Sequence, residues 1–76
     1  MNPYTIEIIT QPANGQDDLT LHRYLADHAG GTLIEDLRTP TLYLPIEADD
    51  IDRAFEVATL TVQNEGLTIV SARIVE

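Results

Sequence analysis

Two clusters of neighbouring aspartates are the groups in this 76-residue sequence best suited to chemistry. The first is Asp17-Asp18, and the second contains Asp49, Asp50 and Asp52. Carboxylates this close together can coordinate a hard cation or act as a paired acid and base. Both clusters precede a predicted helix, where carboxylates accept backbone N–H bonds and meet the positive end of the helix dipole. We therefore interpret them as helix caps and predict no metal site.

The other potential metal ligands do not change this prediction. An EF-hand loop that begins at Asp49 would need glycine and glutamate where Ala54 and Leu60 stand. The two histidines, His22 and His28, are six residues apart, which places them on different sides of a helix. We expect His22 to pair with the carboxylate four residues before it, and His28 to lie at the helix end, where a cationic imidazole meets the negative dipole pole.

Motifs for nucleophilic catalysis and phosphate binding are missing from the sequence. Ser71, the only serine, has no G-x-S-x-G around it. The pairs Asn14-Gly15 and Gly30-Gly31 lack the spacing of a phosphate-binding loop, and there is no lysine to reach a phosphate. We predict a protein that is not an enzyme and has no cofactor.

The charge balance excludes several classes of partner. Thirteen Asp and Glu face four Arg, for a net charge of −9. Nucleic-acid affinity depends on cationic side chains that neutralise phosphates, and anionic membranes also attract cations, so we expect neither partner. Basic proteins, cations and neutral small molecules remain, unless the acidity serves only solubility. Cysteine is absent, and residues 1–4 include no basic residue before an apolar run, so we expect a cytoplasmic location.

Hydrophobic spacing predicts six elements. Alternation and β-branched residues predict strands, and apolar residues at i, i+3, i+4 and i+7 predict helices. The expected strands are 4–10, 32–38, 41–47 and 67–76, and the expected helices run from Asp17 or Asp18 to Ala29 and from Asp49 or Asp50 to about Asn64. The apolar stripes of the helices are Leu21, Tyr24, Leu25 and His28 in the first and Ile51, Ala54, Phe55, Ala58 and Val62 in the second. Asp49 and Arg53 are spaced to pair on the surface of the second helix.

The order β-α-β-β-α-β predicts a single α+β domain over residues 1–76. With right-handed crossovers, this order gives a ferredoxin-like sandwich: a four-stranded antiparallel sheet with both helices on one face. The resemblance is to a layout that many unrelated functions share, and no particular family is recognised.

A sheet covered on one side leaves its other face exposed. If Leu42, Leu44 and Ile46 face the helices, then Tyr43 and Pro45 face away, and alternation adds Ile9 and Ile69 to them. Exposed apolar residues on so small a domain suggest a partner or a second copy, and a homodimer would also add stability.

Three hypotheses for the function follow. The first is a small acidic protein-binding or inhibitory module, similar in size and acidity to phage-encoded inhibitors, whose carboxylates imitate the phosphates of a nucleic acid. The imitating carboxylates would be Asp17, Asp18, Asp27, Glu35, Asp36, Asp49, Asp50, Asp52 and Glu56. The second is a homodimeric domain that senses a small molecule beside residues 11–16. The third is a small enzyme that uses His22 or His28 beside a carboxylate.

Overall fold

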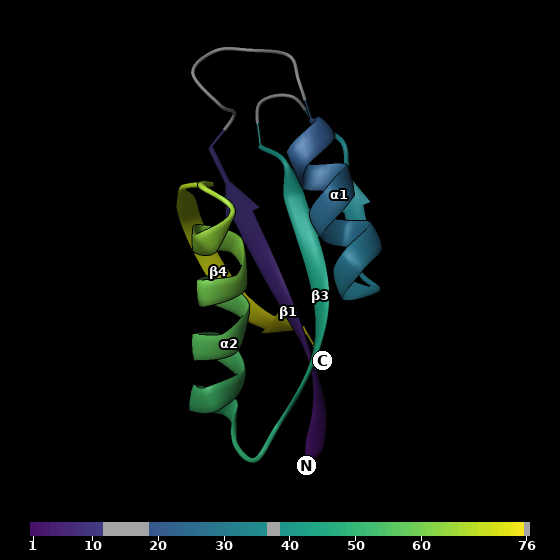
Figure 1. Ribbon diagram of the computed structural model, residues 1–76. Helices are drawn as coiled ribbons and strands as arrows, with labels where there is room; N and C mark the ends of the chain where they lie inside the picture. The colour runs from purple at the N-terminus through teal and green to yellow at the C-terminus, as the bar shows by residue number, and fades with distance from the viewer. Residues whose placement is uncertain (12–18, 37–38, 76) are drawn as a thin grey trace.

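The chain folds as strand, helix, strand, strand, helix and strand, which confirms the predicted α+β class and element order (Figure 1). The computed structural model describes residues 1–11, 19–36 and 39–75. The six elements are β1 Asn2–Thr10, α1 Thr20–Ala29, β2 Thr32–Ile34, β3 Thr41–Ala48, α2 Ile51–Asn64 and β4 Ile69–Val75. Neither described helix is both long enough and apolar enough to cross a membrane.

The largest error in the predicted bounds concerns β2, which ends at Ile34 rather than Arg38. Glu35 and Asp36 follow it without strand structure, and positions 37–38 lie outside the described residues. Glu35 and Asp36 are two consecutive acidic residues, so they lack the alternation that would give a strand one buried face. The strands β1, β3 and β4 lie within two residues of their predicted ends.

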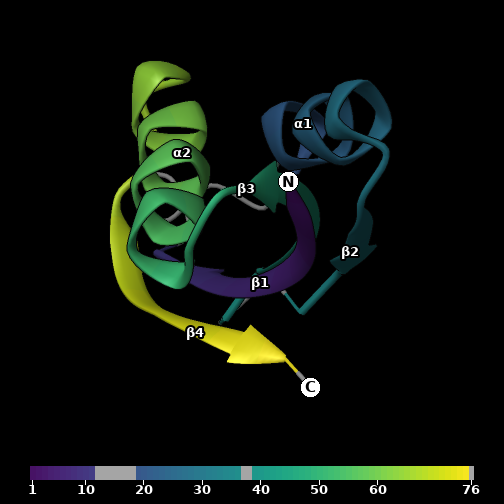
Figure 2. The same cartoon turned by 90° about the horizontal axis from the view of Figure 1, so that it is seen from below.

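The sheet is antiparallel throughout, in the order β2-β3-β1-β4. Both helices lie on the same face of this sheet, with α2 over the β4 side and α1 over the β2 side (Figure 2). The central pair of strands aligns Ile6 with Leu44 and Ile8 with Leu42, so their aliphatic side chains point together towards the helices. The opposite face of the sheet is therefore left without a helix.

The core lies between the sheet and the two helices. Ile6, Ile8, Leu42 and Leu44 are fully buried, and each contributes about 1.5–3 kcal/mol by leaving water. On α2 the buried residues Ala54 and Ala58 are small, which lets the helix approach the sheet closely. The remaining buried members of this core are Leu25, Ala26, Ala48, Val62 and Leu67.

The buried face of α1 is rotated from the predicted stripe. His22, Leu25 and Ala26 are buried, whereas Tyr24 is exposed and stacks on His28, with 3.8 Å between the ring centroids. His22 can be buried because its ring forms a hydrogen bond with the Thr10 hydroxyl in the interior. The helix begins after Leu19, and the predicted caps at positions 17 and 18 lie outside the described residues.

The predicted cap of α2 is confirmed at Asp50, whose Oδ1 accepts a hydrogen bond from the Arg53 backbone N–H at 2.8 Å. The predicted pair between Asp49 and Arg53 is wrong, since Arg53 forms its ion pair with Glu56. Ile51, expected in the apolar stripe, is 41% exposed at the first position of α2.

Asp50→Ala is expected to lower the free energy of unfolding by about 1 kcal/mol, because it leaves a first-turn N–H of α2 without its acceptor. The matched control is Asp49→Ala, which removes the same charge one residue earlier and should cost less than about 0.5 kcal/mol. Urea denaturation of both variants measures the difference. Equal losses in the two would contradict the capping role of Asp50.

The predicted side of Ile69 is wrong. Ile9 pairs with Ser71 and Thr10 pairs with Ile69, so one step on β1 corresponds to two steps on β4. The extra residue, Val70, forms a β-bulge that shifts the alternation by one position. As a result Ile69 packs against the core beside Ala72 and Ile74, and Val70 is 59% exposed.

Candidate functional site

The sheet face that neither helix covers is the candidate site, and we call it the uncovered face. Strand register arranges its side chains in three rows across the sheet, followed by one further pair, Glu47 and Pro3, at the end of β3. The rows are Ile34, Thr41, Ile9 and Ser71; then Thr32, Tyr43, Glu7 and Arg73; then Pro45, Thr5 and Val75.

The middle row holds a hydrogen-bonded group made by three strands. Glu7 on β1 lies opposite Tyr43 on β3 and Arg73 on β4. Arg73 donates from Nε to Glu7 Oε1 at 2.7 Å and from Nη2 to Oε2 at 3.1 Å. The Tyr43 hydroxyl donates to the same Oε2 at 2.9 Å. The two partners cover the carboxylate, whose side chain is only 8% exposed although no helix lies above it.

These bonds shift the pKa values of all three groups. The hydrogen bond from Arg73, with a further one from Tyr43, holds the pKa of Glu7 below its usual value despite partial desolvation. The hydrogen bond to Glu7 raises the pKa of Tyr43, and burial adds to this effect. The same carboxylate raises the pKa of Arg73. At neutral pH the group is therefore an ionised pair with a protonated phenol.

This arrangement is suited to binding rather than to proton transfer. A general base needs a pKa near the working pH, whereas the pKa of Glu7 is lowered and both of its oxygens are already bonded. The raised pKa of Tyr43 keeps its proton in place. What the group presents outwards is a planar guanidinium, whose charge Glu7 balances, and an uncharged phenol ring.

Arg73→Met is expected to raise the pKa of Glu7, because it removes the largest cause of the lowering. Since the pKa of Glu7 is lowered in the folded chain, its stabilising effect is present above the ordinary value of 4.5 and is lost as the pH falls through the folded value. Carbon-13 NMR titration of the Glu7 carboxyl measures the change. Arg53→Met, on α2, is the matched control and should leave the pKa of Glu7 as it is. An unchanged value in Arg73→Met would refute the geometry.

A shallow hollow of about 390 Å³ adjoins the middle row. It is lined by Glu7, Tyr43, Arg73, Ile74 and Val75. Elsewhere on the uncovered face Ile34 is 50% exposed, and Ile9 is partly buried. Apart from the neutralised pair, Glu47 at the end of β3 is the one charged side chain of the described strands on this side. The face thus combines exposed apolar groups with almost no net charge.

The structure brings only some of the predicted contact residues together. Ile9, Tyr43 and Pro45 lie on the uncovered face as expected. Ile69 lies on the opposite side, and Asp49, Asp50 and Asp52 lie at the start of α2. Local sequence patterns do not connect Glu7 with Arg73, which are 66 positions apart. The sequence held one indication of this pair: each of the two predicted strands, in which apolar and polar residues alternate, contains a single charged residue in its interior.

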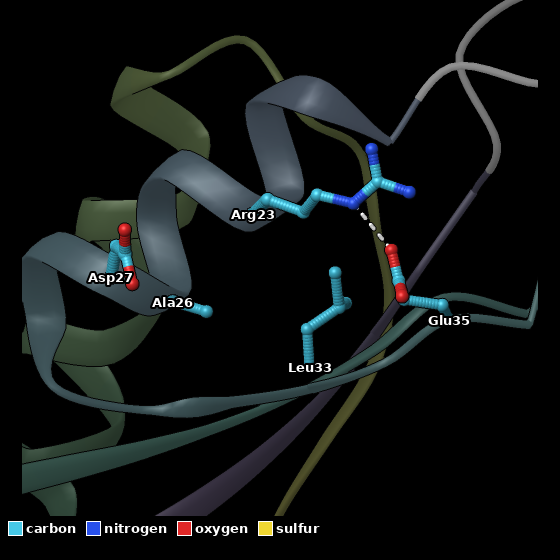
Figure 3. A pocket seen from close by; sticks show the side chains of 5 residues that line it. All are labelled: Arg23, Ala26, Asp27, Leu33 and Glu35. Carbon is cyan, nitrogen blue, oxygen red and sulfur yellow. Dashed lines mark hydrogen bonds and ion pairs between the residues drawn. The ribbon is translucent and has the colours of Figure 1, made fainter.

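A second hollow, of about 350 Å³, lies between α1 and β2 (Figure 3). Ala26 and Leu33 form its apolar part, and Arg23 Nε donates to the Glu35 carboxylate at one side. Both charged side chains are about half exposed, and exposed pairs contribute little to stability. This hollow lies where α1 meets the edge strand of the sheet, and Asp27 completes its lining.

The histidines do not form a joint site. The His22 ring is 1% exposed, and its Nε2 lies 2.8 Å from the Thr10 hydroxyl. His28 Nδ1 lies 3.0 Å from the Tyr24 carbonyl oxygen in the last turn of α1, at the predicted helix end. The predicted partner of His22 at position 18 lies outside the described residues. Within the described part of the chain, no group of three His, Asp or Glu side chains is placed to hold a metal ion.

Comparisons with protein-family models, curated proteins and solved structures find no match to this chain. The fold and the uncovered face are therefore the basis for any functional conclusion.

Proposed function

We propose that the protein is a small binding module that holds another protein chain against the uncovered face. The observation that carries the proposal is the composition of that face. Its centre is Tyr43 and Arg73 over a neutralised Glu7, surrounded by aliphatic side chains and hydroxyls. Interface centres are enriched in Tyr and Arg and depleted in unpaired carboxylates and lysine, and this face has that composition.

We also propose that the fold is ferredoxin-like and that the module works in the cytoplasm. The fold assignment is supported by the β-α-β-β-α-β order, the antiparallel pairing and the position of both helices on one face. The location is supported only by the absence of cysteine, which suits a reducing compartment.

Site-specific photo-crosslinking tests the binding proposal. A benzoylphenylalanine is placed at Ser71, which is exposed on the uncovered face, and as a matched control at Gln63, which is exposed on α2. Each protein is irradiated in an extract of the source organism, and the adducts are identified by mass spectrometry. We expect a defined protein adduct from position 71 and none from position 63. Equal labelling from both positions, or none from position 71, would refute the proposal.

Imitation of a nucleic acid has weaker support. The described carboxylates of the expected array form two groups: Asp49, Asp50, Asp52 and Glu56 at the start of α2, and Asp27, Glu35 and Asp36 on α1 and after β2. These elements lie on the same face of the sheet but towards its two different edges, with α2 near β4 and α1 near β2 (Figure 2). Asp50 is used as a cap and Glu56 as the partner of Arg53. The distribution therefore favours the uncovered face over an acidic surface as the binding element.

The ligand-sensing hypothesis depended on residues 11–16, and all of these but Gln11 lie outside the described residues. It stays a prediction, and a thermal-shift screen against metabolites and divalent cations tests it.

A further inference from the structure

The charges of this protein are distributed unevenly, and the distribution bears on what can occupy the uncovered face. The chain carries a net charge of −9, so two copies repel one another at most orientations. On the uncovered face, however, Glu7 is neutralised by Arg73, and Glu47 stands at its end. The other described carboxylates lie on the helices and connections. Two copies that met through this face would therefore keep most of their carboxylates apart.

The same distribution argues against a basic protein as the occupant. A cationic partner gains affinity and association rate from opposing negative charge. The uncovered face offers it almost none, whereas the start of α2 offers Asp49, Asp50 and Asp52. A basic partner would thus be drawn to α2 and away from the uncovered face.

The uncovered face also has both a recess and a projection, which a self-complementary surface needs. In a two-fold dimer the same patch supplies both the projections and the recesses. The hollow beside Tyr43 and Arg73 is a recess of about 390 Å³, and the half-exposed Ile34 side chain projects from the opposite edge of the sheet. The chain has no disulfide to stabilise its small core, and the area buried in a dimer would add stability.

We propose that the chain bound at the uncovered face is a second copy of this protein, so that two sheets pack against each other with Arg73 and Tyr43 near the centre. This inference rests on the proposed function and names its partner. The dimer has an unusual salt dependence: salt screens the repulsion between two chains of charge −9, so the dimer tightens as salt rises. Rising salt would instead weaken the binding of a basic partner, because it screens the attraction between opposite charges.

Sedimentation equilibrium of the full chain, from about 10 μM to about 1 mM, tests the proposal. We expect the apparent mass to approach that of two chains, and the dissociation constant to fall between about 0.1 M and 1 M salt. Ser71→Glu and Ser71→Lys should each raise the dissociation constant about tenfold or more, because either charge loses water in the interface. Gln63→Glu and Gln63→Lys add the same charges on α2 and should change it less than about threefold.

Adding a negative charge in one variant and a positive charge in the other distinguishes a buried contact at that position from a general effect of net charge. If long-range repulsion alone governed association, the Lys variants would strengthen it at both positions. Thermal melts of the Ser71 variants check that each of them folds. The mass of a single chain at all concentrations would overturn the inference, and so would a dissociation constant that the substitutions of Ser71 leave unchanged. A monomer that still forms a photo-adduct with another protein at position 71 would overturn it while leaving the proposed function intact.

Discussion

Gly31→Ala is expected to destabilise the protein by about 1–3 kcal/mol, which lowers the melting temperature of a domain this size by roughly 5–20 °C. Gly31 follows the C-cap of α1 and passes close to β3. A Cβ at this position would overlap the Tyr43 carbonyl oxygen and lie 3.0 Å from Leu44 Cδ2. Because the overlap is with backbone, it can be relieved only by moving β3 or the end of α1.

The neighbouring glycine provides the control for this prediction. Gly30 has a φ of 68° and ends α1 in the left-handed conformation, but a Cβ there meets nothing within 4 Å. Gly30→Asn should therefore be nearly neutral, since asparagine tolerates this conformation, whereas Gly31→Asn should be as damaging as Gly31→Ala. Thermal melts of the three variants give the comparison. A small loss of stability in Gly31→Ala would show that α1 and β3 are not so closely packed.

Acidification below about pH 6.5 is expected to destabilise the protein through His22. The Thr10 hydroxyl donates to the Pro40 carbonyl oxygen at 3.3 Å, so its 2.8 Å contact with His22 Nε2 is one in which the ring nitrogen donates. His22 Nδ1 is then the unprotonated nitrogen, and it has no partner among the described residues. A second proton would place a buried charge with an unpaired N–H.

The direction of the effect follows from the pKa. Burial lowers the pKa of His22 below 6.5, so the unfolded chain binds this proton more readily than the folded chain. The contribution of neutral His22 is therefore complete above the unfolded value of 6.5 and declines as the pH falls towards the folded value. The slope in that window can reach about 1.4 kcal/mol per pH unit.

Urea denaturation from pH 7 to 5 measures this dependence. His22→Phe should remove most of it, because the replacement ring cannot titrate. His28→Gln is the matched control and should retain the dependence, since it leaves the buried ring in place. The same slope in His22→Phe as in the unsubstituted chain would mean that another group accounts for the acid sensitivity.

Much of the fold could be predicted because local patterns determine it. Alternation in β1 and β3, the apolar spacing of α2 and the Asp50 cap each depend on residues close in sequence. The predictions were wrong where tertiary contacts, and not the local spacing of apolar residues, determine which side chains are buried. His22 was left out of the predicted apolar stripe of the first helix but is buried, with a hydrogen bond to Thr10, and Ile69 was expected on the exposed side but lies inward because of the bulge at Val70.

The candidate site was harder to predict than the fold. Tyr43, Pro45 and Ile9 could be assigned to one face from alternation alone. The Glu7–Arg73 pair depends on the register between the first strand and the last, which no local spacing encodes. Without that pair, the centre of the face has an unpaired arginine and an unpaired glutamate. Its neutrality, on which the proposed function depends, becomes visible only when β1 and β4 lie side by side.

Backbone NMR tests most directly whether the uncovered face is the contact surface. The nitrogen-15-labelled chain, at low concentration, is mixed with unlabelled chain and separately with extract of the source organism. We expect amide signals around Tyr43, Ser71 and Arg73 to shift or broaden in at least one mixture, and those on the outer side of α2 to stay in place. Changes confined to α1 and α2, or none in either mixture, would contradict the account.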